Sequence, residues 1–194
     1  MARAAAAGPL LLLLVCAMAP ACRLSNPHGK AASESYFDDN PDRPTVGDIP
    51  PAGMEIVLES HNRKRKRHCA RALEWSAKLA EVAQGWADAL KKRGCPLDHN
   101  KTKYGENLAA GTASVMTGER AVDIWYEEGD HYKYGPNEAS SATGHFTQVV
   151  WRDSERLGCG TATCAGKRLW VCNYDPPGNV KGEYQDEVKP TTCR

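Results

Sequence analysis

The cysteines are the feature that most constrains this chain. It holds eight of them in 194 residues, and Cys16 lies in an apolar leader that follows Arg3 and contains five consecutive leucines. The leader ends in the small residues Ala19-Pro20-Ala21, as a secretory signal peptide does, and we place that peptide at residues 1–22. Export leads to an oxidising compartment, where the last six cysteines form three disulfide bonds. These six are Cys69, Cys95, Cys159, Cys164, Cys172 and Cys193.

Cys22 is left over from this even count. A mature chain that began directly after Ala21 would carry one thiol without a partner, so two interpretations stay open. Either cleavage falls slightly later and removes Cys22, or Cys22 receives a lipid, as in bacterial lipoproteins, and anchors the protein. We expect a secreted, extracellular protein in the first case. Outside the leader no segment is apolar enough to cross a bilayer, so we expect no transmembrane segment.

The rest of the chain is long enough for one domain. Residues 23–50 are rich in Pro, Ser, Asn and Asp without apolar periodicity, which predicts a flexible linker. We place the domain at 51–185 and a C-terminal tail at 186–194. The net charge of +1 gives no indication of nucleic-acid binding. We therefore expect no nucleic-acid partner, and we expect a monomer.

Apolar periodicity divides the domain into helices and one clear strand. Alternation from Arg168 to Tyr174 predicts the strand, Gly105 to Gly111 is expected to be a loop or short turn, and Gly144 to Trp151 is ambiguous. The cationic run Arg63–Arg67 is expected to be a solvated helix end, and the five tryptophans are expected in the core. Helical spacing occurs in three segments, 54–61, 79–90 and 121–132. Helices beside a small sheet predict a layered α/β domain.

Two long motifs make the pattern specific. Gly-His-Phe-Thr-Gln-Val-Val-Trp begins at Gly144 and leads to Gly158-Cys159-Gly160, and Cys-Asn-Tyr-Asp-Pro-Pro-Gly-Asn begins at Cys172. With His61-Asn62-Arg63 and Gly105-Glu106-Asn107-Leu108, these strings resemble the CAP superfamily of cysteine-rich secretory, antigen 5 and pathogenesis-related proteins. The plant pathogenesis-related, single-domain branch is the most similar. The resemblance implies a three-layer α-β-α sandwich around a small, mainly antiparallel central sheet.

The same resemblance implies a central cleft of two histidines and two glutamates. Glu128 has independent support, because it lies three residues after Trp125 and four before Tyr132 and so shares their inward helix face. Glu127 should point toward solvent instead. The four cleft residues are His99, Glu106, Glu128 and His145.

Three interpretations of this cleft stay open. His99 and His145 are candidate ligands for Zn²⁺ or a similar divalent metal, with the carboxylates adding oxygen ligands or orienting the rings. The groups could instead form a buried hydrogen-bonded network, or serve a metal-dependent or His/Glu-assisted hydrolase of a peptidase-like kind. No nucleophile motif, zinc-protease helix or phosphate loop is present, so we assign no catalytic residue and expect a binding or defence-type module rather than an enzyme.

The resemblance implies further features. It pairs Cys95 with Cys164 and Cys159 with Cys172, and leaves Cys69 and Cys193, outside the plant pattern, as a third pair. His61, Asn62 and Arg63 are expected to cap and brace the core, while His28, His68 and His131 have no partner that the sequence identifies. Tyr174 to Asn179 lies near the family's proposed sterol-binding loop. We therefore weigh a lipid, a sterol or an extracellular protein as partners, or a purely structural domain. Asn100-Lys101-Thr102 is a glycosylation sequon in a eukaryotic host.

Overall fold

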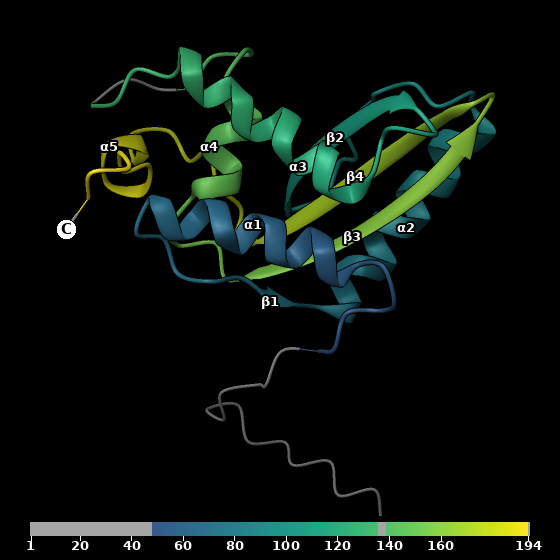
Figure 1. Cartoon of the computed structure of the whole chain (residues 1–194), viewed down its shortest axis with the longest axis horizontal. Helices are drawn as coiled ribbons and strands as arrows, with labels where there is room; N and C mark the ends of the chain where they lie inside the picture. The colour runs from purple at the N-terminus through teal and green to yellow at the C-terminus, as the bar shows by residue number, and fades with distance from the viewer. Residues whose placement is uncertain (1–47, 136–138, 194) are drawn as a thin grey trace, which may run out of the picture. The chain divides into compact units, whose positions relative to one another are not determined.

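The computed structural model describes residues 48–135 and 139–193. The predicted signal peptide, Cys22, His28 and most of the predicted linker lie outside the described residues. The elements follow one another as shown in Figure 1: α1 (Glu55–Arg67), β1 (Glu74–Trp75), α2 (Ala77–Lys92), β2 (Gly105–Thr112), α3 (Gly118–Glu127), the 3₁₀ helix η1 (Glu128–His131), α4 (Gly144–Val150), β3 (Arg156–Cys164), β4 (Lys167–Asp175) and α5 (Tyr184–Glu187). Within these ranges, no helix is long and apolar enough to span a membrane.

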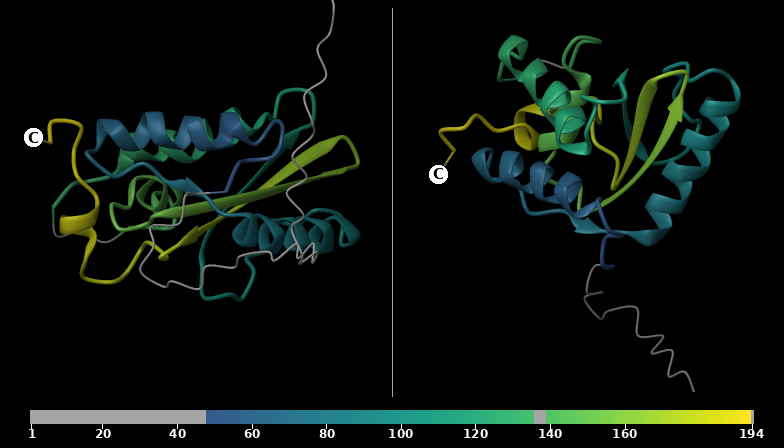
Figure 2. Two further views of the ribbon diagram at one scale, coloured as in Figure 1. Left: turned by 90° about the horizontal axis from the view of Figure 1, so that it is seen from below. Right: turned by 45° about the vertical axis from the view of Figure 1, so that its right-hand side comes forward.

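The strands form one sheet in the order β1-β3-β4-β2. β4 pairs antiparallel with both β2 and β3, whereas β1 adds a two-residue parallel pairing to β3. Helix α2 covers one face of the sheet, and α1, α3 and α4 cover the other (Figure 2). This arrangement confirms the predicted α-β-α sandwich with a mainly antiparallel sheet. Because both faces are covered, residues 169–174 of β4 are buried without interruption.

Helix α2 lies close against the sheet because its inner face is small and β3 presents glycines to it. The hydroxyl of Ser76 accepts a hydrogen bond from the backbone N–H of Leu79 at 3.3 Å and caps the helix start. A Cβ atom on Gly158 would lie 2.1 Å from the backbone nitrogen of Ala80. A side chain at that position would therefore push α2 away from the sheet. The residues that α2 buries are Leu79, Ala83, Ala87 and Leu90.

Two segments differ from the sequence-based expectation. The expected loop at 105–111 is strand β2, whose residues all pair with β4. Its two glycines lower strand propensity, but tertiary packing requires them, since a Cβ on Gly105 would lie 2.1 Å from the side-chain oxygen of Gln148. The expected helix 121–132 ends at Glu127 and continues as the 3₁₀ turn η1. There Gly129 contacts Phe146, and a Cβ would lie 2.7 Å from its ring. The ambiguous segment 144–151 is helical as α4.

The cationic run at the end of α1 is not uniformly solvated, which corrects the expectation for Arg65. Its guanidinium is fully buried and donates to the carbonyl oxygens of Val149 at 3.0 Å and Trp151 at 2.6 Å. Further bonds reach the carbonyls of Arg71 and Ser154. Burial lowers the pKa of Arg65 to about 10, so it stays charged at neutral pH. It therefore satisfies carbonyls at the C-terminal end of α4 and just beyond it, which no helix bond reaches.

Three disulfide bonds join Cys69 to Cys193, Cys95 to Cys164 and Cys159 to Cys172. The last two are the pairs that the resemblance implied, and Cys69–Cys193 is the pair that it left over. The Cys69–Cys193 bond closes a span of 124 residues and fixes the C-terminal segment beside the end of α1. In the chain-entropy view a loop of that length is worth about 4–5 kcal/mol of stability. Four of the five tryptophans are buried as expected, and Trp86 is half-buried with its indole N–H bonded to the carbonyl of Asp98.

Candidate functional site

The first half of the predicted cleft is the pair His99–Glu106. His99 lies in the irregular segment between α2 and β2, and Glu106 is the second residue of β2. The Nδ1 atom of His99 donates to Glu106 Oε1 at 2.8 Å, and the backbone N–H of Asn100 donates to the same oxygen at 2.9 Å. The imidazole is 60% exposed, whereas the carboxylate is 5% exposed. Burial raises the pKa of Glu106, and its other oxygen has no hydrogen-bond partner among the described residues.

The second half is the pair His145–Glu128, built where η1 meets the start of α4. Nδ1 of His145 donates to Glu128 Oε1 at 2.6 Å. The other carboxylate oxygen accepts from the backbone N–H groups of His145 at 3.0 Å and Phe146 at 3.2 Å. These N–H groups belong to the first turn of a helix, which has no partners for them within the helix. Glu128 therefore holds both the ring of His145 and the start of α4.

The two pairs use their ring nitrogens alike. In each, Nδ1 is bound to a glutamate, and no described residue hydrogen-bonds to Nε2 of His99 or His145. A carboxylate on one imidazole nitrogen fixes the ring and makes the opposite nitrogen a better ligand or base. Glu106 and Glu128 thus orient the rings. No three His, Cys, Asp or Glu side chains in the described parts of the chain form a cluster that could hold a metal, so the carboxylates do not join the imidazoles in one such cluster.

Asn107 is a component of this region that the sequence did not single out. Its side-chain amide donates to the backbone carbonyl of His145 at 3.0 Å and to the hydroxyl of Tyr174 at 3.2 Å. It follows Glu106 in β2 and so points to the opposite face of the sheet. Asn107 therefore ties β2, which carries Glu106, to α4, which carries His145. Its place in the Gly-Glu-Asn-Leu string was the available signal.

The second motif also positions α4. The side-chain oxygen of Asn179 accepts from the Thr147 hydroxyl at 2.6 Å, and its amide donates to the carbonyl of Gly144 at 3.0 Å. Asn179 has φ of 60°, a left-handed conformation that asparagine tolerates. The backbone N–H of Gly178 donates to Gln148 at 2.9 Å. The turn that follows β4 thus fastens the helix that presents His145.

Of the other residues assigned from the sequence, some have the predicted role and one does not. Glu127 points to solvent as predicted and pairs with Arg120 at 2.6 Å, with 57% of its side chain exposed. His61 braces the core, and Asn62 forms two hydrogen bonds with the backbone of Leu73. Arg63 does not brace the core, because it is exposed and forms a surface ion pair with Glu119.

His68 has the partners that the sequence could not identify. Its Nδ1 donates to the carbonyl of Lys189 at 2.6 Å, and its Nε2 accepts from the hydroxyl of Tyr126 at 2.8 Å. The ring is almost fully buried. His68 therefore fastens the C-terminal segment to α3 and takes no part in the cleft. His131 is exposed at the end of η1.

Comparison with known proteins agrees with the motifs and the fold. Tobacco (Nicotiana tabacum) pathogenesis-related protein 1A is 41% identical over 67% of this chain and 79% of its own length. The secreted protein RBT4 of Candida albicans is 45% identical over 65% of this chain, which matches only 35% of that protein. The crystal structure of NaASP2 with Zn²⁺ covers 74% of this chain and 90% of its own, with a TM-score of 0.59 at 22% identity, and shows the shared fold.

Residues 58–174 match the cysteine-rich secretory protein family, CAP. The match spans more than half of the chain and includes Glu106, Glu128, His145, the first long motif and the start of the second. This match, the α-β-α sandwich and the 41% sequence identity to a plant pathogenesis-related protein together show the family. The protein belongs to the cysteine-rich secretory protein family, CAP.

Proposed function

We propose that this protein is an extracellular, defence-type CAP module whose cleft binds a divalent metal of the zinc class through Nε2 of His99 and Nε2 of His145. One observation carries the proposal: each Nδ1 is bound to a glutamate, and neither Nε2 has a partner among the described residues. Metal-ligating histidines in proteins share this arrangement, in which a carboxylate or a carbonyl holds the ring nitrogen that does not bind the metal. The secreted relative RBT4 and the pathogenesis-related proteins support the extracellular, defence-type role.

Two features of the site fit a metal. Both rings are accessible, His99 at 60% and His145 at 31% side-chain exposure, so an ion reaches them from solvent. Each glutamate is anchored by at least one backbone N–H, so the rings are held before the ion arrives. The solved relative NaASP2 was crystallised with Zn²⁺. In this proposal Glu106 and Glu128 would orient the imidazole rings, and the rings would hold the metal.

Zinc titration by calorimetry on the mature protein tests the proposal. We expect saturable heat for the wild type, and its loss in the double variant His99→Ala/His145→Ala. His131→Ala, which removes an exposed histidine outside the cleft, should leave the titration unchanged. Glu106→Gln and Glu128→Gln should each weaken binding by about 10–100-fold, the range found for other residues that hold a metal-ligating ring in place. Identical heats for the wild type and the double variant would overturn the metal site.

A lipid or sterol site is a separate prediction and concerns a different surface. The turn after β4 exposes Pro176, Pro177 and Val180, an apolar edge next to the bonds that fasten α4. Sterol binding at this edge should survive the cleft variants and be lost on Val180→Asp. The hydrolase alternative predicts the opposite response to a cleft variant. His145→Ala would abolish turnover while the fold remained.

A further inference from the structure

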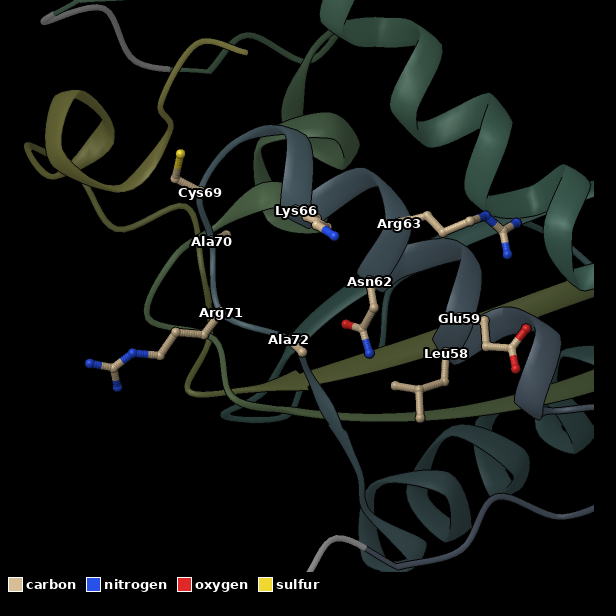
Figure 3. A pocket seen from close by; sticks show the side chains of 9 residues that line it. All are labelled: Leu58, Glu59, Asn62, Arg63, Lys66, Cys69, Ala70, Arg71 and Ala72. Atoms are coloured by element: carbon tan, nitrogen blue, oxygen red, sulfur yellow. The ribbon is translucent and has the colours of Figure 1, made fainter. Parts of the chain in front are cut away.

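A groove on the outer side of α1 lies away from the cleft and has no part in the proposed metal site. It has a volume of about 710 Å³ and runs between α1 and the segment that joins α1 to β1. Figure 3 shows Leu58 and Asn62 projecting from the helix toward the segment that carries Ala72. The Cys69–Cys193 disulfide lies at one end. The groove is therefore held by a helix, an ordered segment and a crosslink, and needs no rearrangement to receive a partner.

The charge along this groove is positive and only partly neutralised. Within the run 63–67, the structure gives Arg63 and Lys64 ion pairs with Glu119 and Asp123, buries Arg65, and sets Arg67 over the ring of Tyr126. Lys66 is exposed without any such partner in the described chain.

Arg71, on the other side of the groove, is also exposed, and its side chain extends away from α1 (Figure 3). No described residue forms a hydrogen bond or an ion pair with its guanidinium. Glu59 is the acidic residue of the lining. Two cations without an ion-pair partner among the described residues, with one carboxylate against them, favour an anionic partner.

The apolar floor of the groove and the backbone of its outer segment limit which anionic partner can bind. Leu58, Ala70 and Ala72 give the floor an apolar surface that an acidic group alone would leave in contact with water. The backbone N–H groups of Arg71 and Ala72 have no acceptor among the described residues. This segment continues into β1, the edge strand of the sheet. Free backbone donors beside an edge strand are what an extended peptide uses when it adds to a sheet.

We propose that this groove binds an extended, acidic peptide segment of a partner protein that also carries an apolar side chain. The acidic side chains pair with Lys66 and Arg71, the apolar side chain lies on Leu58 and Ala72, and the peptide carbonyls accept from the free N–H groups of the segment. A sulfated glycan supplies the charge without the apolar group, and a bilayer surface is too flat to enter a concave site. The peptide alone uses all three features.

The probe is a blocked peptide of about eight residues in which acidic residues flank one leucine, titrated by fluorescence anisotropy at low ionic strength. We expect saturable binding to the wild type and none for the same peptide with lysines in place of its acidic residues. The charge reversal Lys66→Glu/Arg71→Glu should weaken binding by about tenfold or more. The matched reversal Lys91→Glu/Lys92→Glu, on α2, should leave binding unchanged. Both pairs are exposed, so thermal unfolding of the two variants should match.

Filling the floor separates the apolar contribution from the charge. Ala72→Trp keeps every cation and should still abolish the binding of the leucine peptide. Equal binding by both charge-reversed variants would overturn the proposal, as would unchanged binding by Ala72→Trp. So would preferential, Lys66- and Arg71-dependent binding of a heparin oligosaccharide or of phosphatidylserine vesicles. The zinc titration is independent of these variants, so the two proposals fail separately.

Discussion

The histidines at α1 and the histidines of the cleft use their ring nitrogens in opposite ways. His61 donates from Nδ1 to the carbonyl of Val57 at 2.8 Å and accepts at Nε2 from the hydroxyl of Tyr174 at 2.8 Å. His68 likewise has protein partners at both nitrogens. In the cleft, His99 and His145 bind a glutamate with one nitrogen, and the other has no partner among the described residues. The number of bonded ring nitrogens thus separates two kinds of histidine. Bracing histidines, His61 and His68, have both nitrogens bonded, and available histidines, His99 and His145, have one.

Burial reinforces the contrast. It lowers the pKa of His61 to about 3 and lowers that of His68 as well, so both rings stay neutral at physiological pH. A neutral ring with both nitrogens engaged has no site left for a metal or a proton. The two regions are still connected, because Tyr174 bonds His61 and also receives the amide of Asn107, which holds the carbonyl of His145. The bracing network therefore supports the helix on which an available histidine sits.

The largest expected effect follows from removing a bracing histidine. His61→Ala removes the buried acceptor of the Tyr174 hydroxyl and the side-chain donor to the carbonyl of Val57, and it opens a cavity beside Trp125. We expect a loss of about 3–5 kcal/mol in the free energy of unfolding, measured by urea denaturation. A loss below about 1 kcal/mol would contradict the bracing role.

The motifs predicted more of this site than local patterns did. The resemblance supplied Glu106 and His145, and helical phase supported Glu128, although the helix tightens there and Glu128 reaches the start of α4. Helical phase also predicted correctly that the side chain of Glu127 points to solvent. The face on which a helical residue lies follows from its neighbours three or four positions away, which the sequence contains.

Long-range partners could not be predicted from the sequence. Arg65 looks like one cation among five, yet its partners Val149 and Trp151 lie 84 and 86 positions away. His68 meets Lys189 at a separation of 121. Strand β2 was also missed, because its pairing with β4 overrides the weak strand preference of its glycines. Each of these contacts depends on which segments the fold brings together.

A smaller effect should appear in the pH dependence of stability. In the unfolded chain His61 takes up a proton near its ordinary pKa of 6.5, whereas in the folded protein it does so only near 3. Between these values the unfolded state binds more protons, so stability is full above pH 6.5 and is lost as the pH falls. This group alone contributes a slope of up to about 1.4 kcal/mol per pH unit.

Chemical denaturation at a series of pH values from 7 to 4 measures this slope. His61→Phe, which cannot titrate, should be less stable at pH 7 and show a flatter decline below it. His145→Ala should keep the steeper decline of the wild type, because it leaves the buried ring of His61 in place. Parallel curves for the wild type and His61→Phe would show that His61 is not the buried neutral base described above.

The smallest effect on stability should come from an available histidine. His99→Ala removes a ring that is 60% exposed, and Glu106 keeps its bond from the backbone of Asn100. Because the lost ring is largely in solvent, we expect a loss of about 0–1 kcal/mol in the free energy of unfolding, so urea denaturation should barely distinguish the variant from the wild type. The same variant should nevertheless weaken zinc binding, which is the signature of a residue placed for a ligand. If it instead destabilised the fold as much as His61→Ala, His99 would belong with the bracing histidines, and the reason to propose it as a metal ligand would be gone.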